Sequence, residues 1–339
     1  MSVGIDIGSK SIKVVELGRE GNKFRLKAAG VVGYSGVVID SIQKDDKAFV
    51  SLVEVIRKLF KDAKISGKEV AIALAESQVF TRVVTFPPLT DSEIASAVKW
   101  EAEQYIPMPV SEAIIQHQIL ERRENEKGEG VLVLLVAVSK DLVKKYVEIL
   151  EAAGLNCIAA ETELMALARS LAPAEQTVVL VDFGASSTDI AVVKNEQLVF
   201  SRSIPMAGMA FTRAVAQSLG VAEKQAEEYK RAYGLSTTRL EGKVQKALDP
   251  IFRVVAEEIK KAIHFYQVEG KGDIPSSVIL AGGTAGMPDM VSQLTKLIGI
   301  EVVVGNPFSK IVIDPEIAKQ LVDYAPLYPI AVGLAMREG

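Results

Sequence analysis

The sequence predicts an α/β protein made of two similar lobes. Its 339 residues, 49% of them hydrophobic, are more than one compact core usually organises, so two or more domains are expected. One pattern occurs twice, at residues 4–17 and again at 181–193: an apolar strand, Asp-x-Gly, a short hydroxyl-bearing turn and a second apolar strand. A similar order of strands and helices follows each copy. We therefore expect two homologous halves with a cleft between them.

The first half has the pattern of a β-meander that leads into a helix and then returns to the sheet. Strands are expected at about 3–7, 12–17 and 24–32. A helix is expected over 46–63, whose apolar side chains follow helical spacing, and 70–74 is expected to form the returning strand.

The segment that follows has a pattern of its own. Residues 79–86 are strand-like, two prolines end the strand, and Thr90 to Glu93 has capping-box spacing ahead of a helix. A strand pair and a helix come next, at 114–120, 131–138 and 140–153. We interpret this segment as a small inserted α+β subdomain.

The second half repeats the opening plan. Three strands are expected at about 177–183, 188–194 and 197–204. Helices are then expected at roughly 209–219, 221–233 and 246–268, before a strand at 277–281 and a helix at 287–298.

Composition excludes several classes of protein. The net charge is -4 and the Lys and Arg residues are dispersed, so nucleic acid is not expected as a partner. The single cysteine, Cys157, excludes an internal disulfide and fits a reducing cytosol. No segment reaches the ~18 unbroken apolar residues of a membrane span, and the start lacks a signal-peptide pattern, so direct membrane insertion is not expected.

The repeated hairpins suggest phosphate chemistry. A Gly-bearing turn can bring backbone N–H groups close to a phosphate, while Asp6 and Asp182 at the strand ends can hold a hydrated divalent metal. Two such hairpins facing one another would clamp a triphosphate from both sides. The alternative interpretation is a pair of ordinary hairpin turns.

A third motif follows the strand at 277–281. Gly282 and Gly283 leave no side chain to block a flat ring approaching the backbone, and the following helix start supplies free amide donors. A plain strand-to-helix connection is the alternative.

The three motifs resemble, in type and order, the two phosphate loops and the adenosine loop of the superfamily of actin, sugar kinases and heat-shock chaperones. Within it, Phe86-Pro87-Pro88-Leu89 and the run Val-Lys-Trp-Glu-Ala-Glu-Gln-Tyr-Ile-Pro at 98–107 resemble the signature of the PilM family, cytoplasmic actin-like proteins of the type IV pilus and type II secretion platform. The resemblance implies an actin-like, ribonuclease H-like duplicated two-lobe ATPase fold with an inserted FtsA-like 1C subdomain of SHS2 type. The implied ranges are 1–77 for the first part of subdomain 1A, 78–155 for 1C, 156–174 for a return to 1A, 175–310 for 2A and 2B, and 311–339 for the C-terminal return to 1A.

The resemblance also implies a ligand for each motif. ATP or ADP would bind together with Mg²⁺, which Asp6 and Asp182 would hold through its waters. The phosphates would be contacted from the two hairpins by Gly8, Ser9, Lys10 and Ser11, and by Gly184, Ala185, Ser186 and Ser187. The adenosine would lie against Gly282, Gly283 and Thr284, with Glu258 and Lys261 contacting the ribose; an ordinary helical ion pair is the alternative for the last two.

Hydrolysis needs a residue that orients the attacking water. Glu163 falls where the family's catalytic acid would be, and Glu161 is a nearby rival. The sequence departs from the commoner Glu-Pro pairing at this point. We therefore expect tight nucleotide binding with at most slow ATP hydrolysis.

The same resemblance implies a protein partner. In the PilM family this is PilN, whose short N-terminal cytoplasmic segment docks in a groove between 1A and 1C, and other pilus platform proteins and assembly ATPases are further candidates. Residues 331–339 lack the amphipathic targeting helix of FtsA, so recruitment to the inner face of the plasma membrane through a partner is expected. The alternatives are an FtsA-like division or filament-forming protein and a sugar or acetate kinase of the same superfamily.

Overall fold

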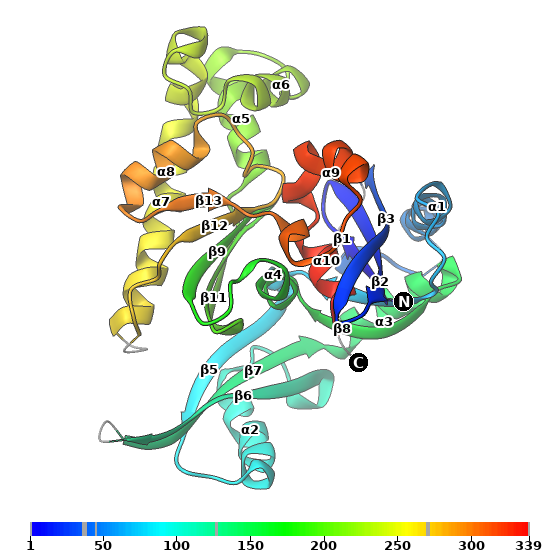
Figure 1. Ribbon diagram of the computed structural model, residues 1–339, viewed down its shortest axis with the longest axis vertical. Coiled ribbons are helices and arrows are strands. Elements are labelled where there is room, and N and C mark those ends of the chain that lie inside the picture. The colour runs from blue at the N-terminus through cyan, green and yellow to red at the C-terminus, as the bar shows by residue number, and fades with distance from the viewer. Residues whose placement is uncertain (1, 36–38, 45, 126–127, 269–271, 338–339) are drawn as a thin grey trace.

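The computed structural model describes residues 2–35, 39–44, 46–125, 128–268 and 272–337. Figure 1 shows two lobes side by side, with a smaller unit below them. Each lobe contains a five-stranded sheet, and the smaller unit contains a three-stranded sheet.

The first sheet has the strand order β3-β2-β1-β4-β8. Its strands are β1 (Ser2–Ile7), β2 (Ser11–Glu20), β3 (Lys23–Gly33), β4 (Glu69–Leu74) and β8 (Asn156–Thr162). Strand β1 pairs antiparallel with β2 and parallel with β4. The predicted hairpin therefore lies in the middle of the sheet, and its turn lies at the carboxyl end of β1.

The second sheet repeats this plan with the order β11-β10-β9-β12-β13. Its strands are β9 (Thr177–Phe183), β10 (Thr188–Lys194), β11 (Gln197–Ile204), β12 (Val278–Ala281) and β13 (Val302–Val304). Strand β9 pairs antiparallel with β10 and parallel with β12, as β1 does with β2 and β4. The two-lobe duplication expected from the repeated hairpin is therefore confirmed.

Helices of the second lobe cover one face of this sheet. They are α5 (Gly208–Leu219), α6 (Glu223–Tyr233), α7 (Lys243–Val268) and α8 (Met290–Ile298). Buried side chains of α5, α7 and α8 form one hydrophobic core with the strands, while α6 packs on α5 beside the cleft between the lobes.

The smaller unit forms from the segment with its own pattern. It consists of β5 (Val79–Phe86), α2 (Asp91–Tyr105), β6 (Ala113–Asn125) and β7 (Gly128–Ser139), with the sheet order β5-β7-β6. The predicted capping box is present, because Thr90 and Glu93 each accept a hydrogen bond from the other's backbone N–H.

Helix α3 (Lys140–Ala153) differs from the prediction, which grouped it with the inserted subdomain. Its buried residues Leu142, Tyr146 and Ile149 pack into the first-lobe core beside α1 (Lys47–Asp62). The apolar stripe of α3 is covered by the first lobe, so the core of the smaller unit ends with β7.

Two short helices lie between the lobes. Helix α4 (Glu163–Leu171) and helix α10 (Pro329–Ala335) share a core with strands of both sheets. Helix α9 (Pro315–Leu321) has no buried residue and lies at the top of the first lobe in Figure 1. A Cβ atom at Gly333 would overlap the carbonyl of Ala166, so glycine is what allows α10 to approach α4 this closely. Across the described residues, no helix combines the length and apolar character needed to cross a membrane.

Candidate functional site

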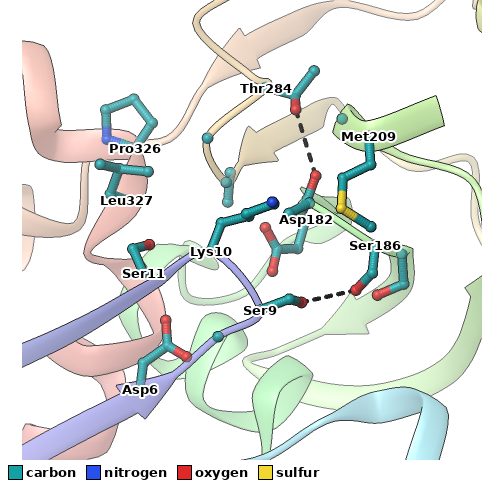
Figure 2. A pocket seen from close by; sticks show the side chains of 18 of the residues that line it. Asp6, Ser9, Lys10, Ser11, Asp182, Ser186, Met209, Thr284, Pro326 and Leu327 are labelled. Carbon is teal, nitrogen blue, oxygen red and sulfur yellow. Dashed lines mark hydrogen bonds between the residues drawn. The ribbon is translucent and has the colours of Figure 1, made fainter. Parts of the chain in front are cut away.

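The turns of the two repeated hairpins face each other across a cleft with a cavity volume of about 600 Å³. In each turn a glycine N–H donates to a serine carbonyl, Gly8 to Ser11 and Gly184 to Ser187, both over 3.1 Å. The hydroxyls of Ser9 and Ser186 meet at 2.9 Å between the lobes (Figure 2). The cleft is lined by these predicted residues: Gly8, Ser9, Lys10, Ser11, Gly184, Ala185, Ser186 and Ser187.

Buried acidic residues form the floor of the cleft. Asp6 is 2% exposed and accepts a 2.9 Å hydrogen bond from Lys13 Nζ. Burial lowers the pKa of Lys13, but the Asp6 carboxylate more than offsets this and leaves the pKa raised. The first hairpin therefore neutralises its own buried acid.

In the second hairpin, the buried acid faces another acid instead of a lysine. Across the β9–β10 ladder, Asp182 lies opposite Asp189, and both side chains are buried. Burial and the Asp189 charge raise the pKa of Asp182 to about 7, although Lys13 acts in the opposite direction. Asp189 accepts a hydrogen bond from the Ser187 hydroxyl at Oδ2, while its Oδ1 has no hydrogen-bond partner among the described residues.

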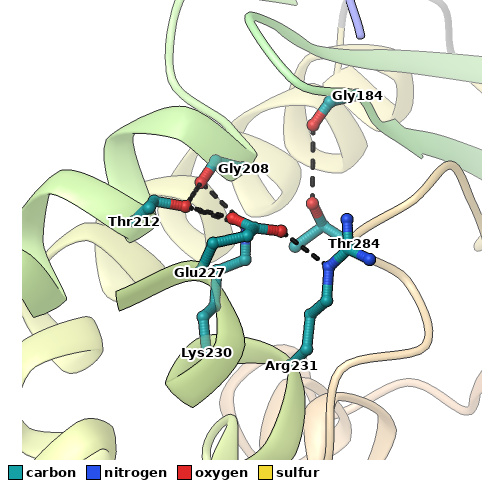
Figure 3. Close-up of polar contacts among 7 residues, drawn as sticks. All are labelled: Gly184, Gly208, Thr212, Glu227, Lys230, Arg231 and Thr284. Atoms are coloured by element: carbon teal, nitrogen blue, oxygen red, sulfur yellow. Dashed lines mark hydrogen bonds and ion pairs between the residues drawn. The ribbon is translucent and has the colours of Figure 1, made fainter. Parts of the chain in front are cut away.

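The third predicted motif closes one side of the same cleft. Gly282 has a φ of +87°, and a Cβ atom there would overlap Asp182 Oδ1, so the turn requires glycine. Its N–H donates to the carbonyl of Pro326 over 2.9 Å. Gly283 and Thr284 also line the cleft, and the Thr284 hydroxyl donates to the carbonyl of Gly184 over 3.4 Å (Figure 3).

The predicted ribose pair lies elsewhere. Glu258 and Lys261 on α7 are not among the residues lining the cleft; they form an ion pair with each other at 2.8 Å, and Glu258 also pairs with Arg202. The core-facing stripe of α7 packs on the second sheet, which leaves this pair on a side of the helix away from the cleft. The ordinary ion pair given as the alternative is what the structure contains.

A second Glu-x-x-Lys pair, on α6, does line the cleft. Lys230 is 6% exposed and donates to Glu227 Oε2 at 2.7 Å and to the carbonyl of Gly208 at 3.1 Å (Figure 3). Burial acts against ionised Glu227, but hydrogen bonds from Lys230, Thr212 and Arg231 lower its pKa to about 2. Burial outweighs the Glu227 contact for Lys230 and lowers its pKa. The sequence reasoning missed this pair, although its spacing is identical to that of Glu258 and Lys261.

The structure also separates the two candidate catalytic acids. Glu163, the first residue of α4, lines the cleft, while Glu161 forms a two-pronged ion pair with Arg169 at 2.5 and 2.7 Å and does not line it. Burial and the charges of Asp189, Asp6 and Asp182 raise the pKa of Glu163 well above its usual range. Glu163 Oε2 accepts a 3.2 Å hydrogen bond from the N–H of Glu76.

A second cavity, of about 730 Å³, lies next to the first one and is also lined by the hairpin turns. It is bounded by the β1–β2 turn, by the single-turn helix Glu76–Gln78 with the start of β5, and by the end of β11. Five residues line both cavities: Gly8, Ser9, Glu163, Ser186 and Ser187. The two cavities therefore share a wall made of the hairpin turns and the start of α4.

The aspartates of the cleft are its candidates for direct metal ligation. Among the described residues, no group of three or more His, Cys, Asp or Glu side chains is arranged to hold a metal ion. Asp6 and Asp182 both line the cleft, so any metal between them would have to complete its shell with water or a ligand's oxygens.

The family model for type IV pilus assembly protein PilM matches residues 4–339. The chain belongs to the PilM family. A solved PilM–PilN type IV pilus biogenesis complex has a chain that is 27% identical and superposes with a TM-score of 0.84, covering 99% of this chain and 98% of that one. The protein is therefore an actin-like member of the PilM family of type IV pilus assembly proteins.

More distant relatives support the same fold. Cell division protein FtsA of Bacillus subtilis strain 168 is 24% identical over 360 residues, covering 93% of this chain and 80% of FtsA. MreB5 of Spiroplasma citri, solved with AMPPNP bound, has a TM-score of 0.55 at 13% identity, covering 98% of this chain and 93% of MreB5. At that identity the likeness supports the actin-like fold alone.

Proposed function

We propose that the cleft binds ATP, with the triphosphate lying between the two hairpins. The observation that carries this proposal is the 2.9 Å contact between Ser9 and Ser186, because it brings two Gly-bearing turns to opposite sides of one narrow space. The cavity of about 600 Å³ falls within the ~300–1,000 Å³ typical of small-molecule sites. The Lys10 side chain points into this space and would add a positive charge facing the phosphates (Figure 2).

The adenosine would occupy the other end of the cleft. The Gly282–Thr284 turn offers backbone without side chains to a flat ring, and Glu227 and Lys230 face it from α6. Because their mutual contacts hold both side chains in place, they are preorganised to bond ribose hydroxyls or ring nitrogens. These two residues take the role expected earlier for Glu258 and Lys261.

Magnesium fits the acidic floor of the cleft. Asp189 Oδ1 has no hydrogen-bond partner in the described part of the chain, and burial together with the Asp189 charge raises the pKa of Asp182. Both observations indicate negative charge that a cation would stabilise. Asp6 and Asp182 would hold the ion through its waters, since Mg²⁺ sheds water reluctantly. When bound, it would neutralise charge on the phosphates.

Glu163 is our candidate for orienting the attacking water. Its carboxyl lines the cleft beside the hairpin turns, and the hydrogen bond from the Glu76 N–H fixes one of its oxygens. Burial and the neighbouring acids raise the pKa of Glu163 and so disfavour the ionised carboxylate, which is the form that accepts a proton from water. We therefore expect ATP hydrolysis to be slow.

The second cavity is our candidate groove for the PilN tail. It lies between first-lobe residues such as Tyr34 and Tyr146 and the start of the inserted segment at Val79 to Thr81, which matches a groove between 1A and 1C. The similar solved structure is a PilM–PilN complex. Binding a membrane partner's tail here would recruit the protein to the inner face of the plasma membrane.

The shared wall supports coupling between nucleotide and tail. A phosphate that spreads Ser9 from Ser186, or that moves Glu163, changes the lining of both cavities at once. A ligand that binds one state of this wall better than the other shifts the population of both sites.

Nucleotide binding can be tested with a fluorescent ATP analogue and a matched pair of lysine variants. We expect Lys230→Met to weaken binding by about ten- to a hundredfold, the usual cost of losing a charged hydrogen bond. Lys261→Met serves as the control outside the cleft and should bind as the wild type does. Equal effects of the two variants, in protein that melts normally, would contradict the assignment of the cleft.

Coupling can be tested by titrating a labelled PilN tail peptide with and without Mg²⁺ and ATP. We expect Asp182→Asn to weaken nucleotide binding and to remove the effect of ATP on tail affinity. Tail affinity that is the same in nucleotide-free and ATP-bound wild-type protein would rule out coupling, while leaving both binding sites in place.

A further inference from the structure

Glu76 is buried beside the second cavity and lacks a full set of hydrogen-bond partners among the residues that the structure describes. It begins the single-turn helix Glu76–Gln78, where the chain leaves β4 for the inserted segment, and its side chain is 5% exposed. Its Oε2 atom makes no hydrogen bond among the described residues, and neither does the Thr81 hydroxyl. Both residues line the cavity. Because buried polar atoms are normally hydrogen-bonded, the pair indicates a place where a donor from outside is expected.

The charges around Glu76 say what kind of donor fits. Burial and the Asp189 charge raise the pKa of Glu76 to about 7. The nearby hydroxyls of Ser201, Thr162 and Thr81 act in the opposite direction and lower it, but by less. Glu163 adds a second acid to the same cavity, and the Arg202 side chain is already paired with Glu258. The cavity therefore repels anions and favours a cationic or N–H-bearing group.

We propose that Glu76 is the specificity-determining residue of the second cavity and accepts a hydrogen bond from an N–H donor on the segment that enters it. The proposal rests on the proposed function, in which that segment is the cytoplasmic tail of the membrane partner. Cytoplasmic segments next to a membrane span are rich in Lys and Arg, so the tail of such a partner supplies donors of this kind. The negative surroundings favour a Lys or Arg side chain over an uncharged amide.

The position of Glu76 gives this recognition a consequence for the nucleotide cleft. The backbone N–H of the same residue holds Glu163 Oε2 at 3.2 Å, and Glu163 lines both cavities. A tail residue that bonds the Glu76 carboxyl would therefore contact the same residue whose backbone N–H holds Glu163, our candidate for orienting the attacking water.

The test is an anisotropy titration of the labelled N-terminal cytoplasmic peptide of the cognate PilN with full-length protein. We expect Glu76→Ala to weaken binding at least about tenfold. Glu76→Gln keeps an acceptor but no charge, so it should bind nearly as poorly as Glu76→Ala if the donor is a cation, and clearly better if it is an amide. Glu69→Gln, an exposed carboxylate on β4, is the matched control and should bind as the wild type does.

Peptide variants identify the donor. Replacing each Lys or Arg of the tail by Met, and each Asn or Gln by Ala, should reveal one position whose loss weakens wild-type binding but costs nothing further in Glu76→Ala. Gln78→Trp, which fills the cavity, tests whether the tail is there at all. If Gln78→Trp abolishes binding while Glu76→Ala and Glu76→Gln bind as the wild type does, this inference is wrong and the proposed groove stands. If Gln78→Trp binds normally, the tail lies elsewhere and both fall together.

Discussion

The two hairpins of this protein have the same backbone arrangement but differ in the residue that lies opposite their buried aspartate. Each has the same glycine-to-serine turn bond of 3.1 Å, and each has an aspartate as the last residue but one of its central strand. Opposite Asp6 on the neighbouring strand is Lys13; opposite Asp182, at the equivalent register, is Asp189. One hairpin therefore pairs its buried acid with a lysine, and the other places two buried acids opposite one another.

This difference assigns separate tasks to two copies of one device. The Asp6–Lys13 pair can stabilise the first lobe whether or not a ligand is present. The Asp182–Asp189 pair is unfavourable until a cation arrives, so the second lobe has more to gain from Mg²⁺. Removing one of the two facing charges from each hairpin should consequently have opposite effects on the stability of the nucleotide-free protein.

The largest expected effect is that of Lys13→Met. Removing Lys13 leaves Asp6 buried without its partner, and breaking a buried ion pair from one side typically costs about 3–5 kcal/mol. Urea denaturation without nucleotide measures this loss. The double variant Asp6→Asn/Lys13→Met removes both charges and should recover most of the stability. A single variant as stable as the wild type would mean that the pair contributes nothing to the fold.

Asp182→Asn is expected to act in the other direction. Because the folded-state pKa of Asp182 is raised from 3.8 to about 7, its contribution to stability is fully present below pH 3.8 and is lost as the pH rises toward 7. The variant avoids this loss, which is at most about 4 kcal/mol at about 1.36 kcal/mol per pKa unit.

The pH profile is the measurement that checks this. Without nucleotide, the melting temperatures of wild type and Asp182→Asn should coincide near pH 4 and separate toward pH 8, with the variant more stable. Adding Mg²⁺ and ATP should raise the melting temperature of the wild type more than that of the variant. Parallel profiles across this range would show that Asp182 and Asp189 do not repel one another in the folded protein.

The sequence predicted the parts of the molecule in which local pattern decides structure. Four strands of each five-stranded sheet and both hairpins follow from short apolar strands and Asp-x-Gly turns, whereas the edge strands β8 and β13 were not predicted. The residues of the three motifs do line one cleft. Helices α4 and α10 were not predicted as elements. All seven residues of α10 are buried between the lobes, so it has no polar face and no helical periodicity to detect.

Which side of a helix faces the cleft was also beyond the sequence. Glu-x-x-Lys occurs on α6 as Glu227 and Lys230 and on α7 as Glu258 and Lys261, and both spacings form the expected ion pair. Only the packing of the two helices determines that the first pair lines the cavity. Lys13 was missed for a different reason: its partnership with Asp6 depends on strand register rather than on the motif itself.

The smallest expected effect concerns the contact that joins the two hairpins. Both Ser9 and Ser186 are near solvent. Ser9→Ala or Ser186→Ala should therefore each lower the free energy of unfolding by only about 0.5–1.5 kcal/mol, the net value of one hydrogen bond. A double-mutant cycle should show that the two losses are not additive, because either variant removes the same bond. Ser292→Ala provides the control, since this hydroxyl donates to the carbonyl of Asp289 in its own helix region and should show no coupling to Ser9. With Mg²⁺ and ATP bound, phosphate oxygens should replace the serine–serine contact, so the coupling between Ser9 and Ser186 should disappear. Coupling that persists unchanged in saturating nucleotide would mean that the triphosphate does not pass between the two turns.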